Sequence, residues 1–144
     1  MSEQESVQVV RQAYDAFRRG DIQGVLDLVA EDADWYHPGP PDTIPFAGRY
    51  RGRDGVAQFF ERLGGAEEAE LFEPQEFFAS GDRVVALGRY RGRVRATGRT
   101  DDVEWAHVFT VRNGKIVSHR QYSDTAAAAE AYRGASARPA GATQ

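Results

Sequence analysis

A chain of 144 residues is long enough to fold as one domain around its own hydrophobic core, and the absence of cysteine excludes disulfide bonds and thiolate metal sites. The net charge of −4 gives no electrostatic reason to expect a nucleic acid or an anionic membrane as a partner. No apolar stretch approaches the roughly 20 residues that span a bilayer, and the acidic first residues lack the features of a secretory signal. We therefore expect a cytoplasmic protein whose partner is a neutral or weakly polar small molecule.

The first half of the chain predicts three helices. Apolar side chains recur every three or four positions over residues 5–19, which indicates an amphipathic helix that ends at Gly20. Asp21 is suited to cap a second, short helix whose apolar residues face the same interior. A third helix is expected before the Gly64-Gly65 pair, which we interpret as its stop.

A strand and a long loop are expected between the second and third helices. Residues 33–37 alternate like a short strand, and the Pro-Gly-Pro-Pro run that follows ends it. The loop over residues 38–53 is long for a compact domain, and such loops are usually functional covers or binding loops. Its apolar residues, among them Ile44 and Phe46, are expected to close over a cavity.

The second half of the chain predicts strands and tight turns. Asn113-Gly114 is the strongest hairpin signal, because both residues tolerate positive φ. Long strands joined this tightly must run antiparallel, and helices followed by a meander indicate an α+β fold. The expected strands cover residues 69–79, 83–97, 103–112 and 115–123. A short helix over 125–133 and a disordered tail over 134–144 complete the chain, which places the folded domain at residues 1–133.

Alternation along the strands separates an inner from an outer face. In the strand 83–97 the even positions are small or apolar and face inward, whereas Arg89 to Arg95 occupy the odd, outer positions. Gly88 and Gly92 thin the inner face, which is consistent with a bent sheet or with space left for a ligand. In the next strand the heavier, aromatic set that includes Trp105 faces inward. In the last strand hydrophobicity does not decide which face is inside.

Four segments resemble the NTF2-like superfamily, and within it the SnoaL-like branch that includes ketosteroid isomerases and polyketide cyclases. They are residues 10–21 (VRQAYDAFRRGD), 30–38 (AEDADWYHP), 46–53 (FAGRYRGR) and 114–124 (GKIVSHRQYSD). The resemblance spans about residues 5–132. It implies a cone in which three N-terminal helices pack on a strongly curved antiparallel sheet that encloses a pocket. It also implies a homodimer and chemistry without a cofactor.

The resemblance assigns catalytic positions residue by residue. The isomerase general base corresponds to His37, the protonated acid of its oxyanion hole to His107, and the catalytic acid of the cyclases to Gln121. The isomerase tyrosine corresponds to Ala13, with Tyr14 one position away. All four positions differ from the family's residues, so an identical mechanism is not implied.

Histidine is the most informative residue type in this chain. Only three histidines occur; His37 and His107 are placed in the pocket, and His119 joins them if the odd face of the last strand is inward. Imidazole titrates near neutral pH, so one such group can accept a proton while another donates one. The expected binding residues around these groups are Trp35, Trp105, His119, Phe109, Phe46 and Tyr90.

The sequence therefore predicts an enzyme that isomerises, cyclises or hydrates an apolar, polyketide- or steroid-like carbonyl compound. His37 would act as the base, and His107, Tyr14 or Gln121 would polarise the oxygen. A binding or interaction module on the same fold, without chemistry, is the alternative. A metal site of three histidines is a weaker one. An epoxide hydrolase ranks last because it needs an Asp, Arg, Asp cluster and no inward carboxylate pair is evident.

Overall fold

The structure is a computed structural model that describes residues 1–136. It contains a curved six-stranded sheet in the order β2-β1-β6-β5-β4-β3. The strands are β1 (Val29–His37), β2 (Gly48–Arg51), β3 (Glu67–Ser80), β4 (Arg83–Val94), β5 (Thr100–Arg112) and β6 (Lys115–Ser123). The helices are α1 (Glu3–Arg18), α2 (Ile22–Leu26), α3 (Gly52–Ala66) and α4 (Thr125–Ser136). The predicted α+β cone, with three helices ahead of a curved sheet, is confirmed.

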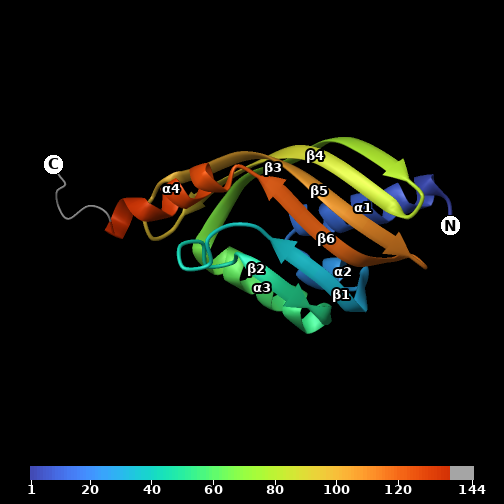
Figure 1. Cartoon of the computed structure of the whole chain (residues 1–144). Helices are drawn as coiled ribbons and strands as arrows, with labels where there is room; N and C mark the ends of the chain where they lie inside the picture. Colours follow the sequence, from blue (N-terminus) through green and yellow to red (C-terminus); the bar gives the residue numbers. More distant parts are fainter. Residues whose placement is uncertain (137–144) are drawn as a thin grey trace.

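The helices close the open side of the sheet. Helix α1 packs on β3, β4, β5 and β6, α3 packs on β1, β2 and β3, and α4 lies at one end of the sheet against β5 (Figure 1). Helix α1 begins with a reciprocal capping box between Ser2 and Glu5. Helix α2 begins at Asp21, whose carboxylate accepts a hydrogen bond from the backbone N–H of Gly24 at 2.9 Å. The helices thus lie over one face of the sheet, and the interior is between the two layers.

Helix α3 corrects one predicted boundary. It runs through Gly64 and Gly65 to Ala66, so the glycine pair is not its stop. The chain leaves the helix at Glu67, which is already extended with φ −138° and donates its backbone N–H to the Leu63 carbonyl. Because strand β3 starts at once, no left-handed turn is needed, and glycine inside a helix costs only about 1 kcal/mol relative to alanine.

The edge of the sheet at β1 and β2 was only partly predicted. Strand β1 starts at Val29 rather than Ala33, and the loop 38–53 contains the short strand β2, antiparallel to β1. On its other side β1 pairs with β6 in parallel, with Trp35 opposite His119. The two segments are far apart in sequence, so local patterning could not reveal this pairing.

The inner faces of β4 and β5 are as predicted. Val84, Ala86 and Val94 of β4 are buried, as are Trp105 and Phe109 of β5. The arginines at the outer positions of β4 form ion pairs with acidic residues of the neighbouring strands. The pairs are Arg89 with Asp102, Arg91 with Glu70 and Arg93 with Glu68.

Strand β6 explains why its inner face was undecidable. The register with β5 shifts, so that Val111 lies opposite Ile116 whereas Thr110 lies opposite Ser118. This irregularity changes the parity of the strand, and Ile116 and His119 are both buried. No single alternation describes such a strand.

Two glycines of β4 make room for side chains. A Cβ at Gly88 would lie 2.5 Å from Cζ2 of Trp105, and a Cβ at Gly92 would collide with the hydroxyl of Tyr90 and lie 2.6 Å from Oε1 of Glu67. The space that the sequence assigned to bending or to a ligand is therefore occupied by an indole ring and by a carboxylate.

The predicted terminal helix is present as α4. Its first turn is capped by Asp124, which accepts a hydrogen bond from the backbone N–H of Ala127 at 3.0 Å. The helix continues to Ser136, and the rest of the tail, residues 137–144, lies outside the described residues. Within residues 1–136, no helix has both the length and the apolar character needed to cross a bilayer.

Candidate functional site

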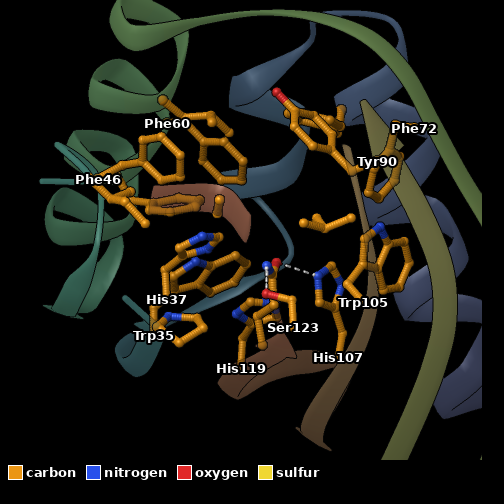
Figure 2. A pocket seen from close by; sticks show the side chains of 18 of the residues that line it. Trp35, His37, Phe46, Phe60, Phe72, Tyr90, Trp105, His107, His119 and Ser123 are labelled. Carbon is orange, nitrogen blue, oxygen red and sulfur yellow. Dashed lines mark hydrogen bonds between the residues drawn. The ribbon is translucent and has the colours of Figure 1, made fainter. Parts of the chain in front are cut away.

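The space between the sheet and the helices holds a cavity of about 100 Å³. Its wall is largely aromatic, and Figure 2 shows the rings of β1, β5 and β6 turned toward the same interior. All ten side chains that the sequence proposed for the site lie in the lining. They are Tyr14, Trp35, His37, Phe46, Tyr90, Trp105, His107, Phe109, His119 and Gln121.

His107 is the centre of a hydrogen-bond chain that crosses the cavity wall. The hydroxyl of Tyr14 on α1 donates to Nδ1 at 2.7 Å, and Nε2 donates to Oε1 of Gln121 at 2.9 Å. Gln121 in turn donates from Nε2 to the hydroxyl of Ser123 at 3.0 Å (Figure 2). With Gln121 oriented in this way, His107 is the neutral Nε2–H tautomer and both of its nitrogens are occupied.

Two indole rings hold the imidazoles in place. His107 stacks on Trp105 with ring centroids 3.9 Å apart and an interplanar angle of 12°. His119 stacks on Trp35 at 4.1 Å and 22°, and the two imidazoles meet edge to face at 4.6 Å. His37, two residues after Trp35 on β1, contacts Phe46 at 4.9 Å. The three histidines, called the histidine end of the cavity below, therefore come from three different strands.

Burial keeps all three imidazoles uncharged. Desolvation lowers the pKa of His37 to about 4. Desolvation also lowers the pKa of His107 to about 3, with the hydrogen bond to Gln121 opposing it and the charge of His37 adding to it. The pKa of His119 lies well below its usual value, first because of burial and then because of the other two histidines. At neutral pH each of the three rings is therefore uncharged.

Four nitrogen atoms of residues in the cavity lining have no hydrogen-bond partner among the described residues. They are Nε1 of Trp35, Nδ1 of His37, Nε1 of Trp105 and Nδ1 of His119. A buried polar group without a partner typically costs about 1–3 kcal/mol. Indole N–H groups only donate, whereas neutral imidazole has one donor and one acceptor nitrogen. The lining can therefore satisfy both an acceptor and a donor on a guest molecule.

The three histidines do not form a metal site. Across residues 1–136, no group of three or more His, Asp and Glu side chains is placed to hold a metal ion. His107 has both ring nitrogens in hydrogen bonds to Tyr14 and Gln121, so neither is open as a ligand.

A buried carboxyl pair lies at another part of the cavity, where the sequence predicted none: Asp101 belongs to the lining, and Glu67 is bonded to Tyr90, which also lines it. Glu67 of β3 and Asp101 of β5 are 3% and 5% exposed. Glu67 accepts hydrogen bonds from the hydroxyls of Tyr90 at 2.6 Å and of Tyr132 on α4. Burial, then the hydrogen bond and charge of Glu67, raise the pKa of Asp101 to about 8. We call Glu67 and Asp101 the carboxyl end of the cavity.

A signal for Asp101 was present in the sequence. The inward alternation of Val103, Trp105 and His107 extends back by one step to Asp101, because β5 begins at Thr100 rather than at Val103. Glu67 gave no such signal, since it lies between the end of α3 and the first alternating residues of β3.

A cone-shaped sheet closed by helices over an aromatic cavity defines the NTF2-like fold. The chain belongs to the SnoaL-like domain family, and the model of that family matches residues 10–119. An uncharacterised protein of Mycobacterium tuberculosis is 26% identical over 132 residues, which cover 92% of this chain and 98% of that protein.

Solved structures agree with this assignment. An NTF2-like protein from Burkholderia xenovorans is 41% identical, with a TM-score of 0.83 over 92% of this chain and 98% of that chain. An NTF2-like protein of unknown function from Burkholderia pseudomallei is 34% identical, with a TM-score of 0.81 over the same shares. TerC, co-crystallised with polyporic acid, is 27% identical, with a TM-score of 0.77 over 90% of this chain and 98% of that chain.

Proposed function

We propose that this protein is an acid-base catalyst that moves a proton on a small carbonyl compound without a cofactor. The observation that carries the proposal is the set of four unpartnered nitrogens of Trp35, His37, Trp105 and His119 around one cavity. The indole N–H groups are suited to donate to a carbonyl oxygen on which negative charge develops. An uncharged imidazole beside them is suited to remove a proton from the adjacent carbon.

His37 is the proposed base. Its Nδ1 is buried, has no partner and belongs to a ring that is neutral at pH 7. His107 is less suited to meet the substrate, because both its nitrogens are already bonded to protein groups. We assign His107, Tyr14 and Gln121 to positioning, since their chain fixes the imidazole that stacks on Trp105.

The cavity volume narrows the substrate class. Drug-sized ligands occupy pockets of about 300–1,000 Å³, whereas a cavity of about 150 Å³ in another protein holds benzene. A cavity of about 100 Å³ therefore favours a compound with a single ring over the steroid- or polyketide-sized compounds that the sequence suggested. The co-crystal of TerC with polyporic acid supports an organic guest for this family.

Isomerisation of 3-cyclohexen-1-one to its conjugated isomer, followed by ultraviolet absorbance, tests the proposal. We expect His37→Gln to lower kcat/KM by about 10²- to 10⁴-fold, the usual contribution of a general base. Trp35→Phe keeps an aromatic ring but removes the indole N–H, and we expect kcat/KM to fall by about 10²-fold. The control is Phe78→Ala, at a side chain that is 52% exposed. A folded His37→Gln variant with unchanged turnover would reject His37 as the base.

The pH profile gives a second readout. The base is neutral imidazole, and the pKa of His37 is about 4, so the rate should be flat near neutral pH and fall only as the pH drops through about 4. Such a low pKa also makes His37 a weak base, which favours the alternative of a binding module. Saturable binding of cyclohexenone without any isomerisation would support that alternative.

A further inference from the structure

The carboxyl end of the cavity is built by three strands and one helix. Across β4, Asp101 lies opposite Gly92 and Glu67 lies opposite Val94, so the two carboxyls meet over the same stretch of that strand. Gly92 leaves the space, because a Cβ there would lie 2.6 Å from Oε1 of Glu67. Tyr132 reaches Glu67 from α4. The strand register, the space at Gly92 and the hydrogen bond from Tyr132 therefore fix the position of the pair.

The hydrogen bonds at this end leave one group unsatisfied. The two oxygens of Glu67 accept from Tyr90 and Tyr132, whose own pKa values are raised by burial, so their hydroxyls remain donors. Within residues 1–136, no N–H or O–H donor reaches Oδ1 of Asp101, although Asp101 is 5% exposed and belongs to the cavity lining. The raised pKa of Asp101 supports one proton shared between the two carboxyls at neutral pH.

We propose that the Glu67–Asp101 pair is a second binding subsite of the cavity, which accepts a hydrogen bond from a hydroxyl or amine group of the guest. The shared proton occupies the contact between the carboxyls, so what Asp101 still presents to the cavity is an acceptor. The pair keeps one negative charge, which also favours a donor over another acceptor. Asp101 therefore differs from the indoles of the lining, whose unpartnered N–H groups on Trp35 and Trp105 are donors.

Asp101 and His107 are six residues apart on the inner face of β5, and both belong to the lining of the same cavity. A compound such as phenol matches a cavity of about 100 Å³ in size and carries the hydroxyl donor that Oδ1 of Asp101 lacks. The inference rests on the proposed function only in needing a cavity that admits a guest, because phenol is bound and not turned over.

Phenol, aniline and toluene are matched probes, because they share a ring and differ in one group. We expect the wild-type protein to bind phenol, aniline or both at least tenfold more tightly than toluene, measured by titration calorimetry. In Asp101→Leu, phenol and aniline should bind about as tightly as toluene, and toluene should still bind. Equal affinity of the wild type for all three probes would overturn the proposal, as would an unchanged preference in Asp101→Leu.

Asp101→Asn keeps the proposal testable if Asp101→Leu does not fold. The amide N–H₂ can replace the shared proton toward Glu67, while the amide carbonyl still accepts from the guest. We expect this variant to retain the preference for phenol or aniline within about threefold. A loss of the preference in folded Asp101→Asn would show that the acceptor is not Asp101 and would overturn the assignment. Isomerase activity is not part of this readout, so its absence would leave the result unaffected.

Discussion

The histidine end and the carboxyl end of the cavity are both buried polar clusters, yet burial moves their protons in opposite directions. Desolvation lowers the pKa of His37 to about 4, so the ring gives up its proton. It raises the pKa of Asp101 to about 8, so the carboxyl keeps its proton. Both groups become neutral near pH 7, because burial penalises the charged form in each case.

The two ends differ more in their partners than in their charge. Around the histidine end, nitrogens of Trp35, His37 and His119 have no partner in the described part of the chain, and neither has Nε1 of Trp105 between the two ends. At the carboxyl end, Glu67 is bonded by Tyr90 of β4 and Tyr132 of α4. The comparison teaches that one end keeps unpartnered nitrogens beside the cavity, whereas the other joins α4 to the sheet.

Among these variants, Trp105→Ala should lower the free energy of unfolding most strongly. The ring lies on β5 between the two ends, stacked on His107 at 3.9 Å and on Phe72 at 5.3 Å. Its removal should lower the free energy of unfolding by about 3–5 kcal/mol, as for other buried aromatic truncations. Urea denaturation measures this, with Tyr122→Ala, at a side chain that is 53% exposed, as a control expected within about 0.5 kcal/mol. Equal effects of both variants would contradict the role of Trp105.

Two tyrosine variants should compare a hydrogen bond to a carboxylate at one end with a hydrogen bond to a neutral imidazole at the other. Tyr132→Phe removes a donor to the Glu67 carboxylate, and we expect a loss of about 2–3 kcal/mol, since hydrogen bonds to charged groups are the stronger ones. Tyr14→Phe removes a donor to neutral His107, and we expect about 1–2 kcal/mol. Thermal or urea unfolding measures both. A larger loss for Tyr14→Phe than for Tyr132→Phe would contradict this ranking of the two hydrogen bonds.

The histidine end should make the free energy of unfolding decrease at acidic pH, and we call this part of the pH profile its acidic limb. His37 and His107 bind protons with a pKa of about 6.5 when unfolded and of about 4 and about 3 when folded, so the unfolded chain binds more protons between these values. The stabilisation is complete above about pH 6.5 and is lost as the pH falls, by about 1 kcal/mol per pH unit for each group. His37→Phe should make this limb shallower by about that amount in urea titrations at pH 4.5–6.5. The exposed variant Glu130→Gln should leave the slope unchanged.

The carboxyl end should make the free energy of unfolding decrease toward alkaline pH, and this alkaline limb should be shallower than the acidic limb because it comes from one group. The pKa of Asp101 is about 8 folded and 3.8 unfolded, so the folded chain binds the extra proton and stability falls as the pH rises toward 8. Above pH 6.5 the histidines no longer compensate, and a slope of at most about 1 kcal/mol per pH unit is expected from this single group. Asp101→Asn should flatten the limb between pH 6.5 and 8. A stability that still declines equally in this variant would assign the limb to another residue.

The sequence was sufficient for the cone and for the members of its lining. Helical spacing located α1, and strand alternation put Trp105 and His107 inward, because each pattern depends on residues close together in the chain. It was insufficient where the answer depends on distant contacts. The parallel pairing of β1 with β6 and the meeting of Glu67 with Asp101 across β4 are such cases.

The hydrogen-bonding state of the site was also beyond the sequence. Trp35 and Trp105 were predicted as walls, but whether an indole N–H has a partner depends on the angles at which neighbouring rings pack. The inner face of β6 was undecidable for a different reason, because the shift opposite Thr110 and Val111 interrupts its alternation.

That shift in β6 makes the composition of the cavity depend on the strand register as well as on residue identity. If β6 paired with β5 without this shift, Val117 would lie opposite Thr110 and Arg120 opposite His107, so Arg120, now exposed, would face the inside in place of the imidazole. A guanidinium cannot lose its charge there, so the interior would become electrically positive. The extra residue at Val117 therefore decides which side chains of β6 enter the pocket, and regular pairing at this point would alter the pocket more than most substitutions within it.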